Sequence, residues 1–93
     1  MEKLQEIKQL LDESRSLEVI AAVDALVAAG AERRVLAQAL YLRGNAYRQR
    51  GDMRQAMNSY LEAIDLEPDG PAAQAYRTIQ EILNFYDHDL YNP

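Results

Sequence analysis

The sequence predicts an all-α protein of five helices. Apolar residues recur at spacings of three and four along most of the 93-residue chain, which is the pattern of an amphipathic helix. No segment alternates apolar and polar residues for long enough to form a strand, and β-branched residues are scarce. Glycine and proline separate the periodic segments. A chain of this length holds one small domain rather than two independent cores.

The first two helices are predicted over residues 2–13 and 17–29. Three residues at i, i+3 and i+7 form the apolar side of the first helix: Leu4, Ile7 and Leu11. The second helix is apolar and rich in alanine, so we expect it to be buried on most sides. Ser14 or Ser16 can cap its start, and Gly30 can end it in the left-handed conformation.

The next two helices, at about 35–50 and 53–66, are separated by Gly51 and Asp52. Asp52 is a favourable N-cap residue for the second of them. Because the turn is short, the two helices must be antiparallel neighbours.

The fifth helix follows the break Pro68-Asp-Gly-Pro71, in which Gly70 can take the cap position and Pro71 the first helical position. It is predicted to end at about Tyr86, with residues 87–93 as a tail. Its apolar stripe consists of Ala72, Ala75, Tyr76, Ile79 and Leu83.

A set of small and large residues recurs at fixed spacing over residues 37–70: Leu40, Gly44, Tyr47, Ala56, Tyr60, Ala63 and Pro68. In this register the segment closely resembles one tetratricopeptide repeat, a helix–turn–helix unit of about 34 residues. Leu40 stands at the tryptophan position of the repeat, and Arg43 stands where the family usually has leucine. The resemblance implies antiparallel helical hairpins that stack into a right-handed superhelix.

The position of Gly44 supports this interpretation, because glycine inside a helix costs about 1 kcal/mol relative to alanine. A close approach of the third and fourth helices at Gly44 and Ala56 explains that choice. Tyr47 and Tyr60 are then expected to fill the space one turn further along.

The flanking segments resemble weaker parts of the same architecture within a single domain. Residues 1–36 resemble a degenerate repeat. Lys8 stands there at the position of the small residue, and Asp24 stands at the position of the aromatic residue. The register of this match can shift by one or two residues. Residues 71–86 resemble the capping helix that closes such arrays. Since Arg43 and Asp24 both replace apolar residues in adjacent repeats, we predict an ion pair between them; the alternative is that Arg43 extends to solvent.

Charge is unevenly distributed along this acidic chain of net charge −5. Residues 33–54 carry six arginines and one acid, whereas residues 1–32 and 62–93 each carry seven acids. We expect these arginines to pair with acidic neighbours of the same protein, with an acidic peptide as the alternative partner. Nucleic acid is not expected to be a partner, because the flanking acids repel phosphate.

The sequence offers no set of catalytic residues, so we expect neither an enzyme nor a bound cofactor. The absence of cysteine excludes thiolate chemistry, and the serines have no neighbouring base. His88 is the one histidine, and we expect it to be an exposed tail residue rather than part of a metal site. No apolar stretch approaches the roughly 20 residues of a membrane span. Since no secretion signal precedes the first helix either, we expect a cytoplasmic protein without membrane contact.

The resemblance implies that the first helix of each repeat lines a concave face. The matching residues of the best repeat are Gln38, Tyr41, Leu42, Asn45, Arg48 and Gln49. Tyr41, Asn45 and Arg48 fall at i, i+4 and i+7, and they suit an extended peptide with an acidic group. Asn45 resembles an asparagine with which some family members grip a terminal carboxylate, but the lysines of that clamp are absent. An ordinary hydrated helix face is the alternative.

These observations predict a protein–protein interaction module that binds an unidentified protein or peptide on its concave face. The alternative is a self-associating module, such as a homodimer, whose groove is filled by a second copy, since about three repeats are usually needed to bury the repeat faces. RNA binding is the third function that we consider, after these two. The segment from Phe85 to Tyr91 is rich in large apolar residues, and it can dock either on its own chain or in a partner's groove.

Overall fold

The computed structural model describes the backbone of residues 1–91 and the side chains of residues 1–85, and this part of the chain contains five α-helices and no strand. The all-α prediction is therefore confirmed. The helices are α1 (Glu2–Asp12), α2 (Ser16–Ala28), α3 (Arg33–Gln49), α4 (Met53–Leu66) and α5 (Ala72–Tyr91).

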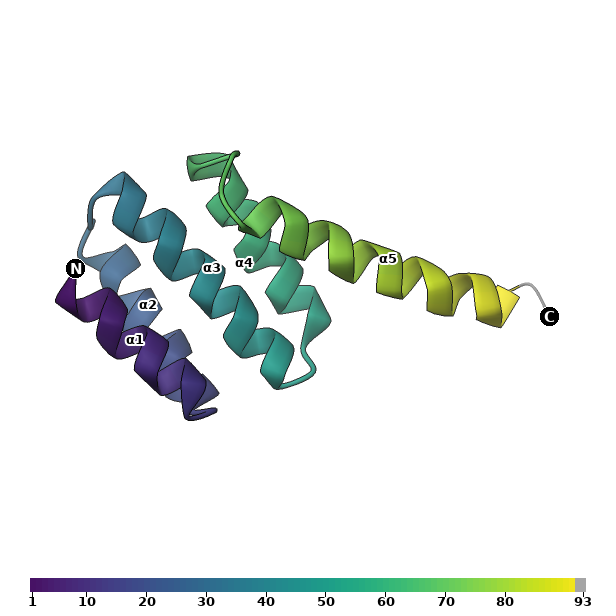
Figure 1. Cartoon of the computed structure of the whole chain (residues 1–93), viewed down its shortest axis with the longest axis horizontal. Helices are drawn as coiled ribbons and strands as arrows, with labels where there is room; N and C mark the ends of the chain where they lie inside the picture. Colours follow the sequence, from purple (N-terminus) through teal and green to yellow (C-terminus); the bar gives the residue numbers. More distant parts are fainter. Residues whose placement is uncertain (92–93) are drawn as a thin grey trace.

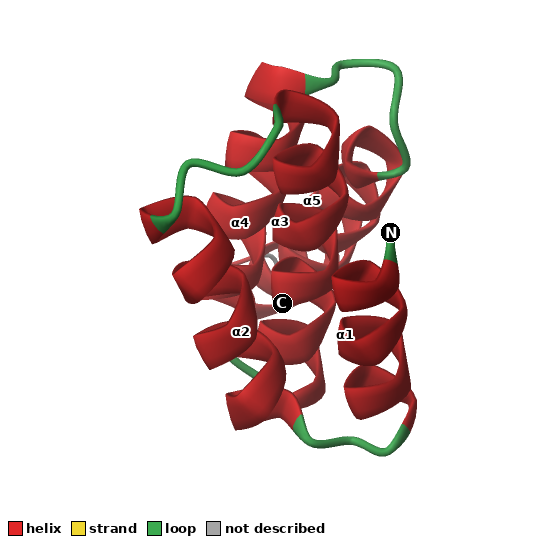
Figure 2. Cartoon of the chain, turned by 90° about the vertical axis from the view of Figure 1, so that its left-hand side faces the viewer, coloured by secondary structure: helices red, strands yellow, loops and turns green. Residues whose placement is uncertain are grey.

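The helices form two antiparallel hairpins followed by a single helix (Figure 1). The first hairpin is α1–α2, the second is α3–α4, and α5 packs against α4. Seen from the end of the molecule, α1 and α5 lie on one side and α2 and α4 on the other, with α3 between them (Figure 2). This arrangement leaves one face formed by the first helix of each hairpin together with α5.

All five helices contribute to one hydrophobic core. Tyr60 of α4 is its largest fully buried side chain, and Ile79 is the last core residue of α5 among the described side chains. Other fully buried members are Ile7 of α1, Val19 and Val23 of α2, Ala39 and Ala46 of α3, and Ala56 of α4.

The first three helices end in the same way. Each is followed by a residue with a positive φ angle: Ser14 at 60°, Gly30 at 68° and Gly51 at 78°. In each case the amide of this residue and the amide of the next donate hydrogen bonds to carbonyls of the last helical turn, which is the Schellman motif. The predicted left-handed helix end at Gly30 is confirmed, and α3 ends before Gly51 as predicted.

The predicted serine caps of α2 are wrong. Ser14 closes the end of α1 instead, and no side chain caps α2. Ser16 is the first residue of α2, and its buried hydroxyl donates to the side chain of Gln49. By contrast, the predicted cap at Asp52 is confirmed, because its carboxylate accepts a hydrogen bond of 3.2 Å from the amide of Gln55.

Helix α5 differs from the prediction at both ends. The carbonyl of Pro71 accepts the first helical hydrogen bond, so Pro71 precedes the helix rather than beginning it. The helix continues to Tyr91 rather than ending at Tyr86, because no glycine or proline interrupts the chain there. Most of the expected tail is therefore helical, and residues 92–93 lie outside the described part. The second half of α5 extends well beyond the other helices (Figure 1).

The close contact between α3 and α4 at Gly44 is confirmed, and the atoms nearest to this glycine belong to Tyr60. A Cβ atom placed on Gly44 would lie within 3.0 Å of three carbons of the Tyr60 ring. The ring of Tyr60 thus occupies the space above Gly44, rather than a space one turn further along. The glycine is needed because a fully buried aromatic side chain lies against the backbone of α3.

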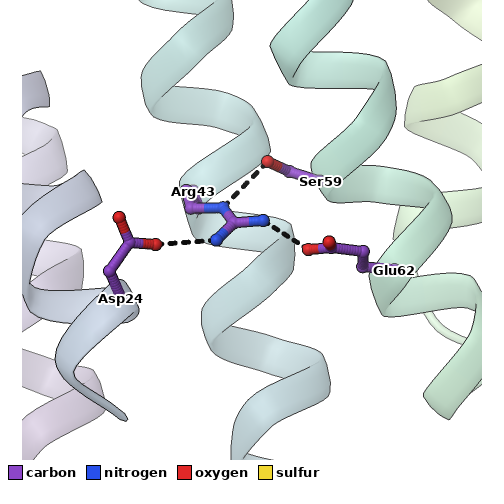
Figure 3. Close-up of polar contacts among 4 residues, drawn as sticks. All are labelled: Asp24, Arg43, Ser59 and Glu62. Carbon is purple, nitrogen blue, oxygen red and sulfur yellow. Dashed lines mark hydrogen bonds and ion pairs between the residues drawn. The ribbon is translucent and has the colours of Figure 1, made fainter. Parts of the chain in front are cut away.

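The predicted ion pair between Arg43 and Asp24 is present, with 2.7 Å between Nη1 and Oδ1. Arg43 also pairs with Glu62, and its Nε donates to the hydroxyl of buried Ser59 at 3.0 Å. The guanidinium lies between α2 and α4 and connects both to α3 (Figure 3). With its side chain 14% exposed, Arg43 does not extend to solvent as the alternative held.

Candidate binding surface

A hollow of about 310 Å³ lies on the face formed by α1, α3 and the start of α5. Its floor is apolar, because it is formed by side chains that are themselves part of the hydrophobic interior: Ala37, Leu42, Ala63 and Ala72. Polar and aromatic side chains surround it, namely Lys8, Gln38, Tyr41 and Glu67. The connection between α4 and α5 closes one end through Gly70 and Pro71.

A second, more open depression of about 520 Å³ lies towards the C-terminal end of α3. Its lining residues are Leu11, Asp12, Asn45, Arg48 and Gln49. The six residues predicted for the concave face are therefore divided, three in each depression. Both depressions lie along α3, which makes this helix the centre of the candidate surface.

Tyr41 forms an aromatic wall of the hollow. Its side chain is half-buried, and its ring centroid lies 6.0 Å from that of Tyr60, with 36° between the ring planes. Leu42, in contrast, is only 6% exposed. It belongs to the floor rather than to the exposed contact surface that the sequence suggested.

Asn45 and Arg48 present hydrogen-bond donors in the second depression. The hydroxyl of Tyr60 donates to Oδ1 of Asn45, which leaves the amide nitrogen of Asn45 to donate elsewhere. Burial raises the pKa of Tyr60, and the nearby Arg48 acts in the opposite direction to a smaller extent. Tyr60 therefore stays protonated at neutral pH and holds Asn45 in this orientation.

Gln49 has a structural role that its sequence position did not reveal. Its Oε1 accepts a hydrogen bond of 2.8 Å from Ser16, and its Nε2 donates to the backbone carbonyl of Leu11 at 3.1 Å. These two bonds join the turn of the first hairpin to α3. Its amide is therefore engaged within the chain and is not available as a primary contact for a partner.

Two charged residues of the hollow were missed by the sequence analysis as members of the site. Lys8 was assigned to the small-residue position of the weak repeat pattern, but it is exposed and lines the hollow. A shift of register in the first repeat, which the weak pattern allowed, would have found it. Glu67 follows the end of α4, and its position depends on how the chain turns into α5, which no local pattern specifies.

Other chemistry receives no support from the described residues. No group of three or more histidine, cysteine, aspartate or glutamate side chains within them could hold a metal ion. The side chain of His88 lies outside the described residues. None of the described helices combines the length and the apolar character that crossing a bilayer requires.

Comparisons with known proteins agree with the fold. The family model of the tetratricopeptide repeat matches residues 37–69. The solution NMR structure of the Bacteroides fragilis protein BF1650 is similar over 99% of this chain and 91% of that chain, with 40% sequence identity and a TM-score of 0.85. The search of curated proteins gave no match.

Proposed function

We propose that this chain, which contains a tetratricopeptide repeat over residues 37–69, is a non-enzymatic interaction module that binds an extended segment of another polypeptide chain. The binding surface is the face formed by α1, α3 and the start of α5. The observation that carries the proposal is the hollow with an apolar floor and an aromatic wall beside α3.

The chemistry of this face defines the ligand. An apolar side chain fits the hollow beside Tyr41, and a carbonyl or carboxylate oxygen suits the donors of Asn45 and Arg48. Tyr41 and Arg48 are seven residues apart on one helix, which corresponds to about 10 Å. Since an extended chain advances about 3.3 Å per residue, the ligand carries its acidic group about three residues from its apolar residue.

Peptide selection with the full chain tests this proposal. A library of random peptides is displayed, and the selected peptides are measured by fluorescence anisotropy at low protein concentration. We expect them to share an apolar residue and an acidic residue at this spacing. Tyr41→Ala and Arg48→Glu should each weaken binding at least tenfold.

Arg50→Glu is the matched control for Arg48→Glu. Arg50 is exposed at the end of the same helix and lines neither depression, so the same change of charge should alter binding less than twofold. Circular dichroism checks that each variant keeps its helices. Selected peptides that bind all three variants as well as the unchanged chain would refute the proposed surface.

A further inference from the structure

We propose that the hollow is occupied by the second half of α5 from a second copy of the chain, and that the two copies exchange these helices reciprocally. The inference rests on the proposed function because it uses the same face, but the occupant that it names is a helix of a second copy instead of an extended segment, so the two ligands would compete for the hollow. Three features of the structure support it: the exposed apolar side of α5, the geometry of that helix, and the distribution of charge.

The second half of α5 carries large apolar side chains outside the core. Ile82, Leu83 and Phe85 are 38%, 36% and 67% exposed, whereas Ile79, one turn earlier, is fully buried. The apolar spacing of the packed half thus continues into the half that leaves the body of the protein. Helical residues with this pattern are typical of a segment that packs into a groove.

The chain cannot place this segment in its own hollow. Pro71 and Ala72 line the hollow at the start of α5, and Phe85 lies thirteen residues further along the same continuous helix. At 1.5 Å per residue, the helix carries Phe85 about 20 Å away. The helix leads away from the rest of the molecule (Figure 1), so only another copy can supply the segment.

The charges of the two surfaces favour the same contact. After Arg77 the sequence contains three acidic residues and no lysine or arginine. The receiving face contains Lys8 and Arg48, and neither forms an ion pair with any carboxylate of the described residues. Asp12 and Glu67 line the same face and leave it without net charge, so Lys8 and Arg48 attract the acidic segment only locally and apolar burial supplies most of the affinity.

Reciprocal exchange also explains how a small contact can give a stable pair. Specific dimers bury about 1,200–2,000 Å² in total, and two copies of the contact reach this range more readily than a single helical segment of about three turns. With two-fold symmetry the contact is made twice, and the two α5 helices run antiparallel. A one-way contact would instead leave a free hollow at the end of the assembly and continue into a filament.

Sedimentation equilibrium of the full chain between about 5 and 500 µM tests the proposal. We expect a concentration-dependent dimer. Ile82→Glu places a charge on the inserted segment, and Gln38→Trp fills the hollow from an exposed position. Each change should raise the dimer dissociation constant at least tenfold. Gln80→Glu introduces the same charge in the same turn of α5 but on the other side of the helix, and should change the constant less than twofold.

A mixture of the two disruptive variants, Ile82→Glu and Gln38→Trp, tests the reciprocal contact most directly. The Ile82→Glu chain keeps an intact hollow, and the Gln38→Trp chain keeps an intact α5. One native contact remains in the mixed pair, so an equimolar mixture should form heterodimers at concentrations where each variant alone is monomeric. Circular dichroism shows that both variants are folded.

Three outcomes would overturn the proposal: a monomeric unchanged chain over the whole range, a dimer that Gln38→Trp leaves intact, or a mixture that stays monomeric. The second outcome would indicate that two α5 helices pair without using the hollow. If the chain is monomeric but selected peptides still require Tyr41 and Arg48, the proposed function stands and only the identity of the occupant is wrong.

Discussion

The distance between α3 and α4 is set by single residues. Gly44 lacks the one carbon that would collide with the Tyr60 ring, and the Tyr60 hydroxyl reaches Asn45 on the same helix as Gly44. The sequence predicts a close approach at this glycine because glycine is otherwise unfavourable inside a helix. It does not identify Tyr60 as the partner, because the direction of that ring depends on a hydrogen bond between two helices.

Gly44→Ala should therefore destabilise the protein. The substitution improves helix propensity by about 1 kcal/mol, but the new methyl group collides with a ring that has no free space to enter. We expect a net loss of about 1–3 kcal/mol in the free energy of unfolding, measured by urea denaturation.

The double variant Gly44→Ala/Tyr60→Leu is the control for this prediction. Removing the ring should make the alanine nearly neutral or favourable against the Tyr60→Leu background, so the two effects should not add. Additive losses would show that the ring is not the cause.

Residue type alone also failed to identify the role of two predicted surface residues. Gln49 and Leu42 lie on the expected side of α3, as helical periodicity requires. Gln49 bonds to the first hairpin, however, and Leu42 forms the floor of the hollow. Both outcomes depend on how α1 docks against α3, which no recognisable pattern in residues 1–36 encodes.

At the level of helices, the sequence predicts starts and ends well where a residue has one dominant conformational preference. Gly30 and Gly51 adopt left-handed conformations that are uncommon for other residues, and both helix ends were found. Ser14 adopts the same conformation and was missed, because a non-glycine residue with positive φ gives no signal in the sequence. The end of α5 was missed because no stop signal precedes Pro93.

Asp52→Ala tests the cap of α4. The carboxylate of Asp52 satisfies an amide in the first turn of that helix, and its loss should lower the free energy of unfolding by about 1 kcal/mol. Asp52→Asn keeps an acceptor oxygen and should remain within about 0.5 kcal/mol of the unchanged protein. Equal losses in the two variants would point to the charge rather than the hydrogen bond. Thermal and urea denaturation provide the measurement.

Across the whole molecule, Arg43 joins helices from both hairpins. The sequence predicts its contact with Asp24 because two departures from the family pattern fall on adjacent repeats. It does not predict Ser59 or Glu62, which lie on α4 and come within reach only once the second hairpin has closed. The helices were thus predictable from periodicity and their pairing from turn length and from the resemblance to the repeat, whereas contacts between three helices were not.

Arg43→Ala should cost about 1–3 kcal/mol, because it leaves the buried hydroxyl of Ser59 without a charged donor and two carboxylates without their cation. Asp24→Ala and Glu62→Ala should each cost no more than about 1 kcal/mol, since both carboxylates are more than half exposed. Urea denaturation measures all three free energies.

A triple variant separates charge from packing at this position. Asp24→Ala/Arg43→Leu/Glu62→Ala removes the whole charged cluster and restores the apolar residue typical of the family. It should recover most of the stability lost in Arg43→Ala, because burying leucine needs no counter-ion. A triple variant that is less stable than Arg43→Ala would show that the guanidinium holds the hairpins together in a way that packing cannot replace.

Tyr41, which lines the hollow, gives this protein an intrinsic optical signal. The chain has no tryptophan, so its ultraviolet emission comes from six tyrosines, and one of them forms the wall where a ligand would enter. A side chain that displaces water from Tyr41 changes that emission without any attached dye. An incoming indole would collect excitation energy from the neighbouring phenols, so occupancy could be followed in real time in the unmodified molecule.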